Sequence, residues 1–152
     1  MSEWISEKDW ETIVQNVPIV SVDLVVKRSD GIVLGKRTNE PAKGEWFVPG
    51  GRVLKSETRV EAVHRIAEEE LRITVEVTES LGAFEHCYET SDVDGVETKH
   101  YLANGYVVEV DSGKIQPDDQ HEEIQVFESA PDSLHTYIRS YADMSEVIID
   151  WL

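Results

Sequence analysis

The spacing of apolar positions predicts a helix followed by a β-hairpin at the start of the chain. Ser6 is a suitable N-cap, and the apolar residues after it recur at helical spacing. These residues are Trp10, Ile13 and Val14. Apolar runs over residues 19–26 and 32–34 flank a Ser29-Asp30-Gly31 turn, a pattern that predicts an antiparallel hairpin.

Strand and helix patterns alternate through the rest of the sequence. A short apolar strand over residues 46–48 stops at Pro49-Gly50-Gly51, and Ser56 is a candidate N-cap for a helix over about residues 57–71. Further strands are predicted over 73–77, 81–88 and 102–110, polar loops over 38–45, 90–98 and 116–123, and a last helix capped by Asp132 or Ser133. With no internal repeat or linker, residues 1–152 are expected to form a single α+β domain with a mixed β-sheet and flanking helices.

The charge of the chain is strongly negative. Fourteen lysines and arginines oppose 31 aspartates and glutamates, which gives a formal net charge of −17. We therefore expect neither a nucleic-acid nor a membrane partner, because both are anionic. The carboxylates are dispersed along the chain, as in proteins of salt-adapted (halophilic) organisms; the alternative, a cation or a basic partner, would need a clustered acidic tract.

Cysteine content and hydropathy favour a cytoplasmic location. Cys87 is the only cysteine, so an internal disulfide is impossible and a reducing compartment suits the chain. No apolar window reaches the roughly 18 residues of a transmembrane helix. The polar and acidic start is unlike a signal peptide.

Three adjacent glutamates near the end of the predicted helix point to a metal site. Glu68-Glu69-Glu70 repel one another and oppose the helix dipole, so a nearby cation would relieve them. Oxygen ligands suit Mg²⁺ or Mn²⁺. Gly50 and Gly51 permit close backbone approach, which allows a main-chain carbonyl to join the ligands. The alternative is a solvated acidic helix end.

Residues 50–73, GGRVLKSETRVEAVHRIAEEELRI, resemble the Nudix hydrolase signature G-x5-E-x7-R-E-U-x-E-E-x-G-U, where U is a bulky apolar residue. The matching fixed positions are Gly51, Glu57, Arg65, Glu69 and Glu70. Two positions depart from it, because Ile66 replaces a glutamate and Arg72 replaces a glycine. The resemblance implies an α/β/α sandwich around a mixed sheet, a divalent cation, and hydrolysis of a nucleoside diphosphate linked to another group.

The chain is most similar to the GDP-mannose mannosyl hydrolase branch of that family, which also lacks the glutamate replaced here by Ile66. The similarity spans residues 17–127 and includes the runs 35–39, 46–53 and 120–121. It implies hydrolysis of a GDP-hexose, of the GDP-mannose or GDP-glucose type, by attack of water at sugar C1, with release of GDP. It also implies a homodimer, for which the leading helix (residues 1–17) would expose Trp4 and Trp10.

The same resemblance assigns metal ligands and a general base. The Gly50 carbonyl, Glu70 and Gln120 would hold Mg²⁺ together with a β-phosphate oxygen, and His121 would take a proton from the attacking water. Glu69 has no counterpart in the mannosyl branch and is an additional candidate ligand. With Glu69 bound to a second ion, the alternative activity is that of a pyrophosphohydrolase attacking phosphorus; a non-catalytic nucleotide-sugar sensor is a further alternative.

Substrate contacts are implied for four other positions. Arg37 and Arg52 would neutralise charge on the departing diphosphate, and Tyr101 would donate a hydrogen bond to it. Asp23 would line the sugar pocket or orient the base. Arg65 is expected to be structural, because Glu61 and Glu69 lie at ion-pair spacing from it on the helix. The family resemblance also implies that Arg65 pairs with Glu57. The histidines that show no ligand spacing, and so receive no function, are His64, His86, His100 and His135.

Dispersed surface acid predicts that stability depends on salt. Lowering the salt concentration from about 1 M to about 0.1 M should lower the midpoint of thermal unfolding, because carboxylate repulsion is then less screened. Circular dichroism at a series of salt concentrations measures this midpoint. A midpoint that does not change, or that rises as salt is withdrawn, would contradict the salt-adapted interpretation.

Overall fold

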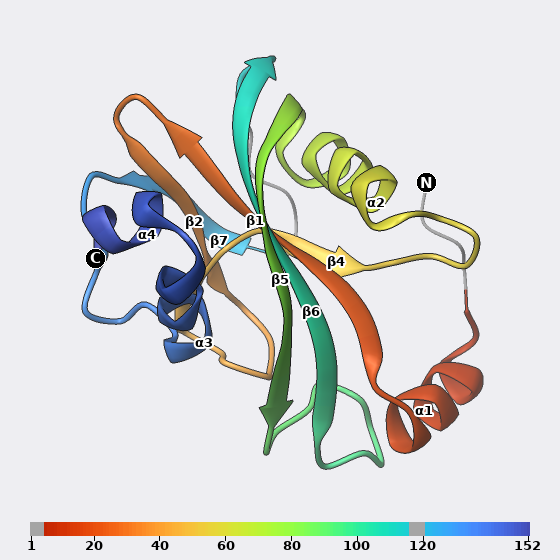
Figure 1. Cartoon of the computed structure of the whole chain (residues 1–152). Helices are drawn as coiled ribbons and strands as arrows, with labels where there is room; N and C mark the ends of the chain where they lie inside the picture. The colour runs from red at the N-terminus through yellow and green to blue at the C-terminus, as the bar shows by residue number, and fades with distance from the viewer. Residues whose placement is uncertain (1–4, 116–120) are drawn as a thin grey trace.

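The structure, a computed structural model, describes residues 5–115 and 121–152, with no side chains described for residues 121–123. The elements are α1 (Glu7–Asn16), β1 (Ile19–Arg28), β2 (Gly31–Arg37), β3 (Trp46–Phe47), β4 (Gly50–Arg52), α2 (Arg59–Ile66), the π-helical turn η1 (Ala67–Leu71), β5 (Thr74–Tyr88), β6 (Lys99–Ser112), β7 (His121–Phe127), α3 (Thr136–Arg139), the 3-10 helix η2 (Ser140–Met144) and α4 (Glu146–Trp151). Figure 1 shows α2 and the C-terminal helices on different sides of the sheet.

Seven strands in the described part of the chain form one mixed sheet, with the central order β3-β2-β1-β6-β5. Strand β1 is parallel to β6 and antiparallel to its other neighbours. Residues 21–23 of β1 pair with β4, whereas residues 26–28 pair with β2. Both partners lie on the edge of β1 opposite β6, so this edge forks (Figure 1).

Two apolar cores fill the opposite faces of the sheet. The core under α2 contains Val22, Leu24, Val26, Val63 and Ile66, among others. The core under the C-terminal helices contains Val25, Leu81, Ile138, Tyr141 and Trp151, among others. Because side chains alternate along a strand, the odd-numbered Asp23 points to the face that carries Tyr141. The expected α+β architecture, helices packed around a mixed sheet, is confirmed.

The helix that carries the glutamates begins later than predicted and widens before it ends at Leu71, the predicted end. Thr58, not Ser56, is the N-cap, and it forms a capping box with Glu61. Ser56 has φ 70°, which places it in the loop before the cap. From Ala67 to Leu71 the helix widens into the π-helical turn η1, which the spacing of apolar residues does not reveal. Arg72 then ends it in the left-handed conformation, with φ 58° and ψ 38°.

Three other elements also differ from the sequence prediction. The strands predicted over 73–77 and 81–88 are one long strand, β5, with irregular register opposite β6. The loop predicted to end at Glu123 ends earlier, because β7 begins at His121. The last helix is three short helical segments, of which the first is capped by His135 rather than by Asp132 or Ser133.

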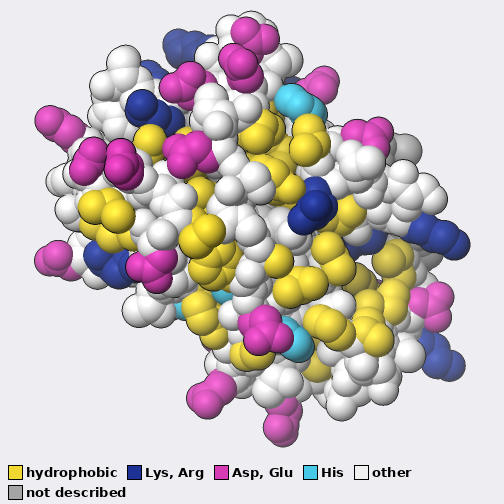
Figure 2. Space-filling view, in the orientation of Figure 1, with side chains coloured by type: hydrophobic (Ala, Val, Ile, Leu, Met, Phe, Trp, Pro, Cys, Tyr) yellow, Lys and Arg dark blue, Asp and Glu magenta, His cyan; other side chains and the backbone are white. Residues whose placement is uncertain are grey.

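The surface carboxylates are dispersed, as the sequence predicts. Figure 2 shows acidic side chains scattered over the visible face, with an apolar area across its middle. No helix within residues 5–115 and 121–152 is long and apolar enough to span a membrane. Trp4 lies outside the described residues. Trp10 is half-buried rather than exposed, because it packs against the cluster of Val14, Ile19 and Val96.

The left-handed exit at Arg72 predicts a stabilising substitution. Arg72→Gly should raise the free energy of unfolding by about 0.5–1 kcal/mol, because relief of the left-handed strain exceeds the entropy that glycine adds to the unfolded chain. Arg72→Ala is the matched control, since it also removes the exposed side chain but keeps Cβ. Urea unfolding measures both variants. Equal stability of the glycine and alanine variants would show that the backbone conformation is unstrained.

Candidate active site

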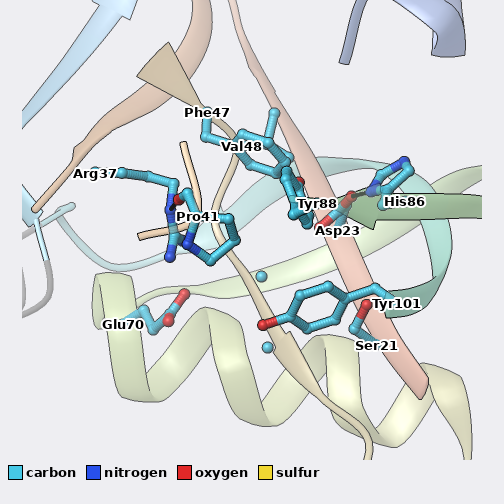
Figure 3. A pocket seen from close by; sticks show the side chains of 12 residues that line it. Ser21, Asp23, Arg37, Pro41, Phe47, Val48, Glu70, His86, Tyr88 and Tyr101 are labelled. Carbon is cyan, nitrogen blue, oxygen red and sulfur yellow. Dashed lines mark hydrogen bonds and ion pairs between the residues drawn. The ribbon is translucent and has the colours of Figure 1, made fainter. Parts of the chain in front are cut away.

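A cleft lies in the fork between β4 and β2. Its deep part is lined by Ser21, Asp23, Phe47, Val48, His86 and Tyr88. Its outer part is lined by Trp10, Arg52, Asp92 and Lys99, among others. Arg37, Gly50, Gly51, Glu70 and Tyr101 line both parts and therefore mark their junction. Figure 3 shows Glu70 entering this space from the helical side and Tyr101 entering it from the sheet.

Asp23 is a buried carboxylate at the bottom of the deep part. It is 6% exposed and accepts a hydrogen bond of 2.6 Å from the Tyr141 hydroxyl. Burial raises the pKa of Asp23 to about 6, although the Tyr141 hydrogen bond and the positive charge of Arg37 act in the opposite direction. Asp23 is therefore largely ionised at neutral pH and carries a negative charge into the deep pocket.

His86, which received no function from the sequence, is part of this site. Its Nδ1 lies 4.0 Å from Asp23 Oδ2, and its ring stacks on Tyr137 with 4.3 Å between centroids. Burial and the nearby His135 lower the pKa of His86 to about 4, so it is neutral when Asp23 is ionised. Its Nε2 is buried with no hydrogen-bond partner among the described residues. Only the apolar–polar alternation of β5 could have suggested that His86 faces Asp23 across the intervening strand β6.

Arg65 braces the site, as the sequence predicts. Its guanidinium donates to Glu57 at 2.7 Å, to Glu69 at 3.1 Å and to the carbonyl of Arg52 at 2.8 Å. The hydrogen bond from Arg65 is the main reason that the pKa of Glu57 is lowered. Glu61 is not a partner, because it completes the capping box with Thr58. Glu69 lines the outer cleft, but one of its oxygens is already bound to Arg65.

Ile66, which stands where the signature has a glutamate, belongs to the apolar core. It is 2% exposed and packs among the residues under α2. A Cβ at Gly51 would lie 3.1 Å from Ile66 Cδ1, so β4 and the helix are in close contact here. The side chain that replaces a carboxylate thus fills space between the helix and β4 and offers no metal ligand.

Gly50 and Glu70 provide oxygen ligands at the junction. A Cβ at Gly50 would lie 2.6 Å from the carbonyl oxygen of Val22, so β4 can approach β1 this closely only with glycine. The backbone N–H of Leu24 donates to the carbonyl of Pro49, and the N–H of Val53 donates to the carbonyl of Val20. In the antiparallel pairing of β1 with β4, Gly50 therefore occupies a non-hydrogen-bonded position, and its carbonyl points away from β1. The Glu70 carboxylate lines both parts of the cleft.

These donors fit a hard divalent cation. One carboxylate and one carbonyl are the ligands that Mg²⁺ accepts while it keeps waters and phosphate oxygens for its other positions. Within the described residues, no group of three or more His, Cys, Asp or Glu side chains is placed to hold a metal. An ion at the junction would therefore take its remaining ligands from water, from a phosphate or from residues that the structure does not describe.

The remaining predicted residues are placed as follows. Arg37 lies at the junction and donates to the carbonyl of Pro41 at 2.7 Å. Arg52 lies in the outer part, its guanidinium 5.5 Å from the centre of the Trp10 ring. Gln120 lies outside the described residues. The backbone of His121 pairs with Arg37, so β7 passes beside the junction, but the His121 side chain is not described.

Comparison with known proteins decides the family. Residues 17–149 match the NUDIX domain family. This chain is a Nudix protein. The match begins directly after α1 and includes the whole sheet and both apolar cores, apart from Trp151.

The chain is also similar to individual proteins, of which one is a NUDIX hydrolase of known structure. The low-salt glycan biosynthesis protein Agl8 of Haloferax volcanii is 50% identical over 139 residues, which cover 91% of this chain and 89% of that protein. An ADP-ribose pyrophosphatase of Methanocaldococcus jannaschii is 32% identical over 111 residues, 73% of this chain and 62% of that protein. The crystal structure of a MutT NUDIX hydrolase from Burkholderia pseudomallei superposes with a TM-score of 0.68 at 29% identity, covering 84% of this chain and 97% of that one.

The Nudix assignment gives the site its general chemistry. Nudix proteins are hydrolases that generally use a divalent metal ion such as Mg²⁺, and the ion, when bound, would neutralise phosphate charge. In this Nudix chain, Gly50 and Glu70 would hold it. Arg37 brings a second positive charge to the junction, and Asp23 and His86 form an adjoining polar pocket with no net positive charge.

The raised pKa of Asp23 predicts a specific pH dependence of stability. Between about pH 4 and pH 6, folded Asp23 keeps a proton that the unfolded chain has released, so its contribution to stability is lost as the pH rises through this window. Asp23→Asn stays neutral, and its stability relative to wild type should rise by up to about 3 kcal/mol between about pH 4 and pH 7. Denaturant unfolding at each pH measures this difference.

The control for this experiment is Asp150→Asn, which neutralises an exposed carboxylate instead. Its stability difference from wild type should stay constant over the same pH range. If the Asp23 and Asp150 variants changed in parallel with pH, the buried carboxylate would have an ordinary pKa.

Proposed function

We propose that this protein hydrolyses a GDP-hexose, of the GDP-mannose or GDP-glucose type, in a Mg²⁺-dependent reaction at sugar C1. Water attacks C1, the bond between C1 and the diphosphate oxygen breaks, and the bonding pair leaves with GDP. The attacking water loses its proton to His121, and the products are GDP and the free hexose.

The main support is the small number of carboxylates that the described residues place at the junction for a metal ion. Ile66 is packed in the core where the signature has a glutamate, and Glu69 is partly engaged by Arg65. Glu70 is then the principal carboxylate facing the junction. A site with one ion suits charge neutralisation on a leaving diphosphate better than it suits activation of a nucleophile for attack at phosphorus.

The shape of the cleft supports a sugar beside the diphosphate. The deep part offers polar groups to hydroxyls, from Ser21, Asp23 and His86, and aromatic faces to ring carbons, from Phe47 and Tyr88. The charge of ionised Asp23 would favour the positive charge that builds on the sugar ring in the transition state. Cleavage at carbon therefore agrees with the electrostatics of the pocket.

The leaving group would be stabilised at the junction. Arg37 and Arg52 carry positive charge there and in the outer part, and Tyr101 lines both parts of the cleft with its hydroxyl available as a donor. With its charge shared in this way, GDP needs no general acid to leave, so a single base suffices. We assign that role to His121 and an additional ligand role to Gln120, on the resemblance to the mannosyl branch.

The names of relatives bear on the substrate in two ways. Agl8 of Haloferax volcanii is named for glycan biosynthesis, which agrees with a nucleotide sugar. The Methanocaldococcus relative is named an ADP-ribose pyrophosphatase. Together with the position of Glu69 in the outer cleft, the second name favours a competing proposal, attack at phosphorus of a nucleoside diphosphate derivative.

Isotope labelling distinguishes these reactions. With GDP-mannose or GDP-glucose hydrolysed in ¹⁸O-labelled water at high salt with Mg²⁺, the label should appear in the free hexose and be absent from phosphate. Mass spectrometry of the products measures this. Label in GMP or in sugar phosphate would replace the proposal by the pyrophosphohydrolase, and GDP-hexose binding without turnover would replace it by a sensor.

Two histidine variants test the assigned base in the same assay. His121→Gln should lower kcat by about 10²–10⁴-fold, the usual contribution of a general base. His64→Gln, on the exposed surface of α2, should leave kcat within about twofold of wild type. An undiminished rate in the His121 variant would remove this residue from the mechanism.

A further inference from the structure

The outer part of the cleft contains an ion pair that the proposed reaction does not use. Lys99 Nζ lies 2.8 Å from Asp92 Oδ1 and so links the first residue of β6 to the loop between β5 and β6. Both residues line the outer cleft, on the far side of the junction from the sugar pocket. A nucleotide whose diphosphate lies at the junction would have its base on this side.

The two members of the pair differ in exposure. The Lys99 side chain is 7% exposed and its Nζ lies 5.5 Å from the centre of the Tyr101 ring, so it belongs to the wall of the cleft. The Asp92 side chain is 39% exposed. Lys99 therefore anchors one oxygen of a carboxylate whose remaining surface stays accessible, and a fixed acceptor of this kind suits ligand recognition.

The loop that carries Asp92 is itself held in place. Val93 and Val96 pack with Val14 of α1 and with Ile19, and Tyr101 joins the same cluster. A Cβ at Gly95 would lie 3.0 Å from Glu11 Oε1, so the tip of the loop closely approaches α1. Figure 1 shows the loop beside α1. The position of Asp92 relative to the junction is thus fixed by packing.

The wall between Asp92 and the junction suits a flat ring. The Trp10 indole lies under the guanidinium of Arg52, and both line the outer cleft. Tyr101 lies two residues beyond Lys99 on β6, on the same face of the strand, about 7 Å further along. Planar aromatic and guanidinium groups of this kind stack on nucleobases with little preference among them.

We infer that Asp92, held by Lys99, selects guanine as the base of the substrate. Guanine presents two adjacent donors, N1–H and the 2-amino group, which match the two oxygens of a carboxylate. Adenine presents an acceptor, N1, in place of that N–H and has no 2-amino group, so the carboxylate would repel its edge. This inference rests on the proposed function, since it assigns the base of the nucleotide whose diphosphate the junction binds.

Binding of nucleoside diphosphates to the intact protein tests the inference without turnover. Isothermal titration with GDP, IDP and ADP, at high salt with Mg²⁺, compares three bases on one diphosphate. IDP lacks only the 2-amino group, so GDP should bind about 10- to 100-fold more tightly than IDP, and at least about 100-fold more tightly than ADP. GDP and IDP binding equally, or ADP binding as tightly as GDP, would overturn the inference on the wild-type protein alone.

Two matched variants then locate the selectivity. Asp92→Asn should reduce the preference for GDP over IDP to within about fivefold, because the amide has one acceptor oxygen and its NH₂ opposes a donor. Asp94→Asn removes an exposed carboxylate from the same loop, outside the cleft lining, and should keep the wild-type preference. Thermal unfolding of each variant confirms that it is folded. An unchanged GDP preference in folded Asp92→Asn would overturn the assignment.

The two proposals fail in different ways. Label from ¹⁸O water in phosphate would end the proposed attack at carbon and leave the base preference intact. Equal binding of GDP and IDP would end the role of Asp92 even if free hexose were released from the nucleotide sugar.

Discussion

The guanidinium group of Arg65 joins three segments that are separate in the sequence, and the cleft depends on that connection. It binds Glu57 in the loop before α2, Glu69 in the π-helical turn and the carbonyl of Arg52 at the end of β4. The side chains of Arg65 and Glu57 are 16% and 14% exposed, so this pair is shielded from the solvent that weakens surface ion pairs. With β4 and the turn tied together, Gly50 and Glu70 are brought to one junction.

Ile66 is a core residue, but it lies where the helix contacts β4, next to the groups that would bind the metal ion. Ile66 adds apolar packing between the helix and β4 where the Nudix signature has a carboxylate. The apolar side chain at this position therefore offers packing contacts and no oxygen ligand. Among the side chains that the structure describes, few carboxylates face the junction, because Arg65 engages Glu57 and Glu69. The described part of the chain can therefore carry many surface carboxylates and still offer few carboxylates to a metal ion at the junction.

The deep part of the cleft differs in charge from the junction and the outer part. Asp23 and neutral His86 lie in a deep pocket with aromatic walls, whereas Arg37 and Arg52 lie at and beyond the junction. A negative group on one side of a reacting bond and positive groups on the other would favour separation of charge across that bond. The Asp92–Lys99 pair extends this arrangement into the outer part of the cleft.

The sequence by itself determined the place of most helices and strands and the signature segment from Gly50 to Ile73, because apolar periodicity, glycine pairs and signature spacing are local properties. It also predicted the pairing of Arg65 with Glu69, which lies four residues further along the helix, but the same spacing wrongly offered Glu61. Only the tertiary structure brought His86 to Asp23, widened the helix at Ala67–Leu71 and continued β5 through a polar stretch. These features depend on packing between segments far apart in the chain, and no local pattern records which strands become neighbours.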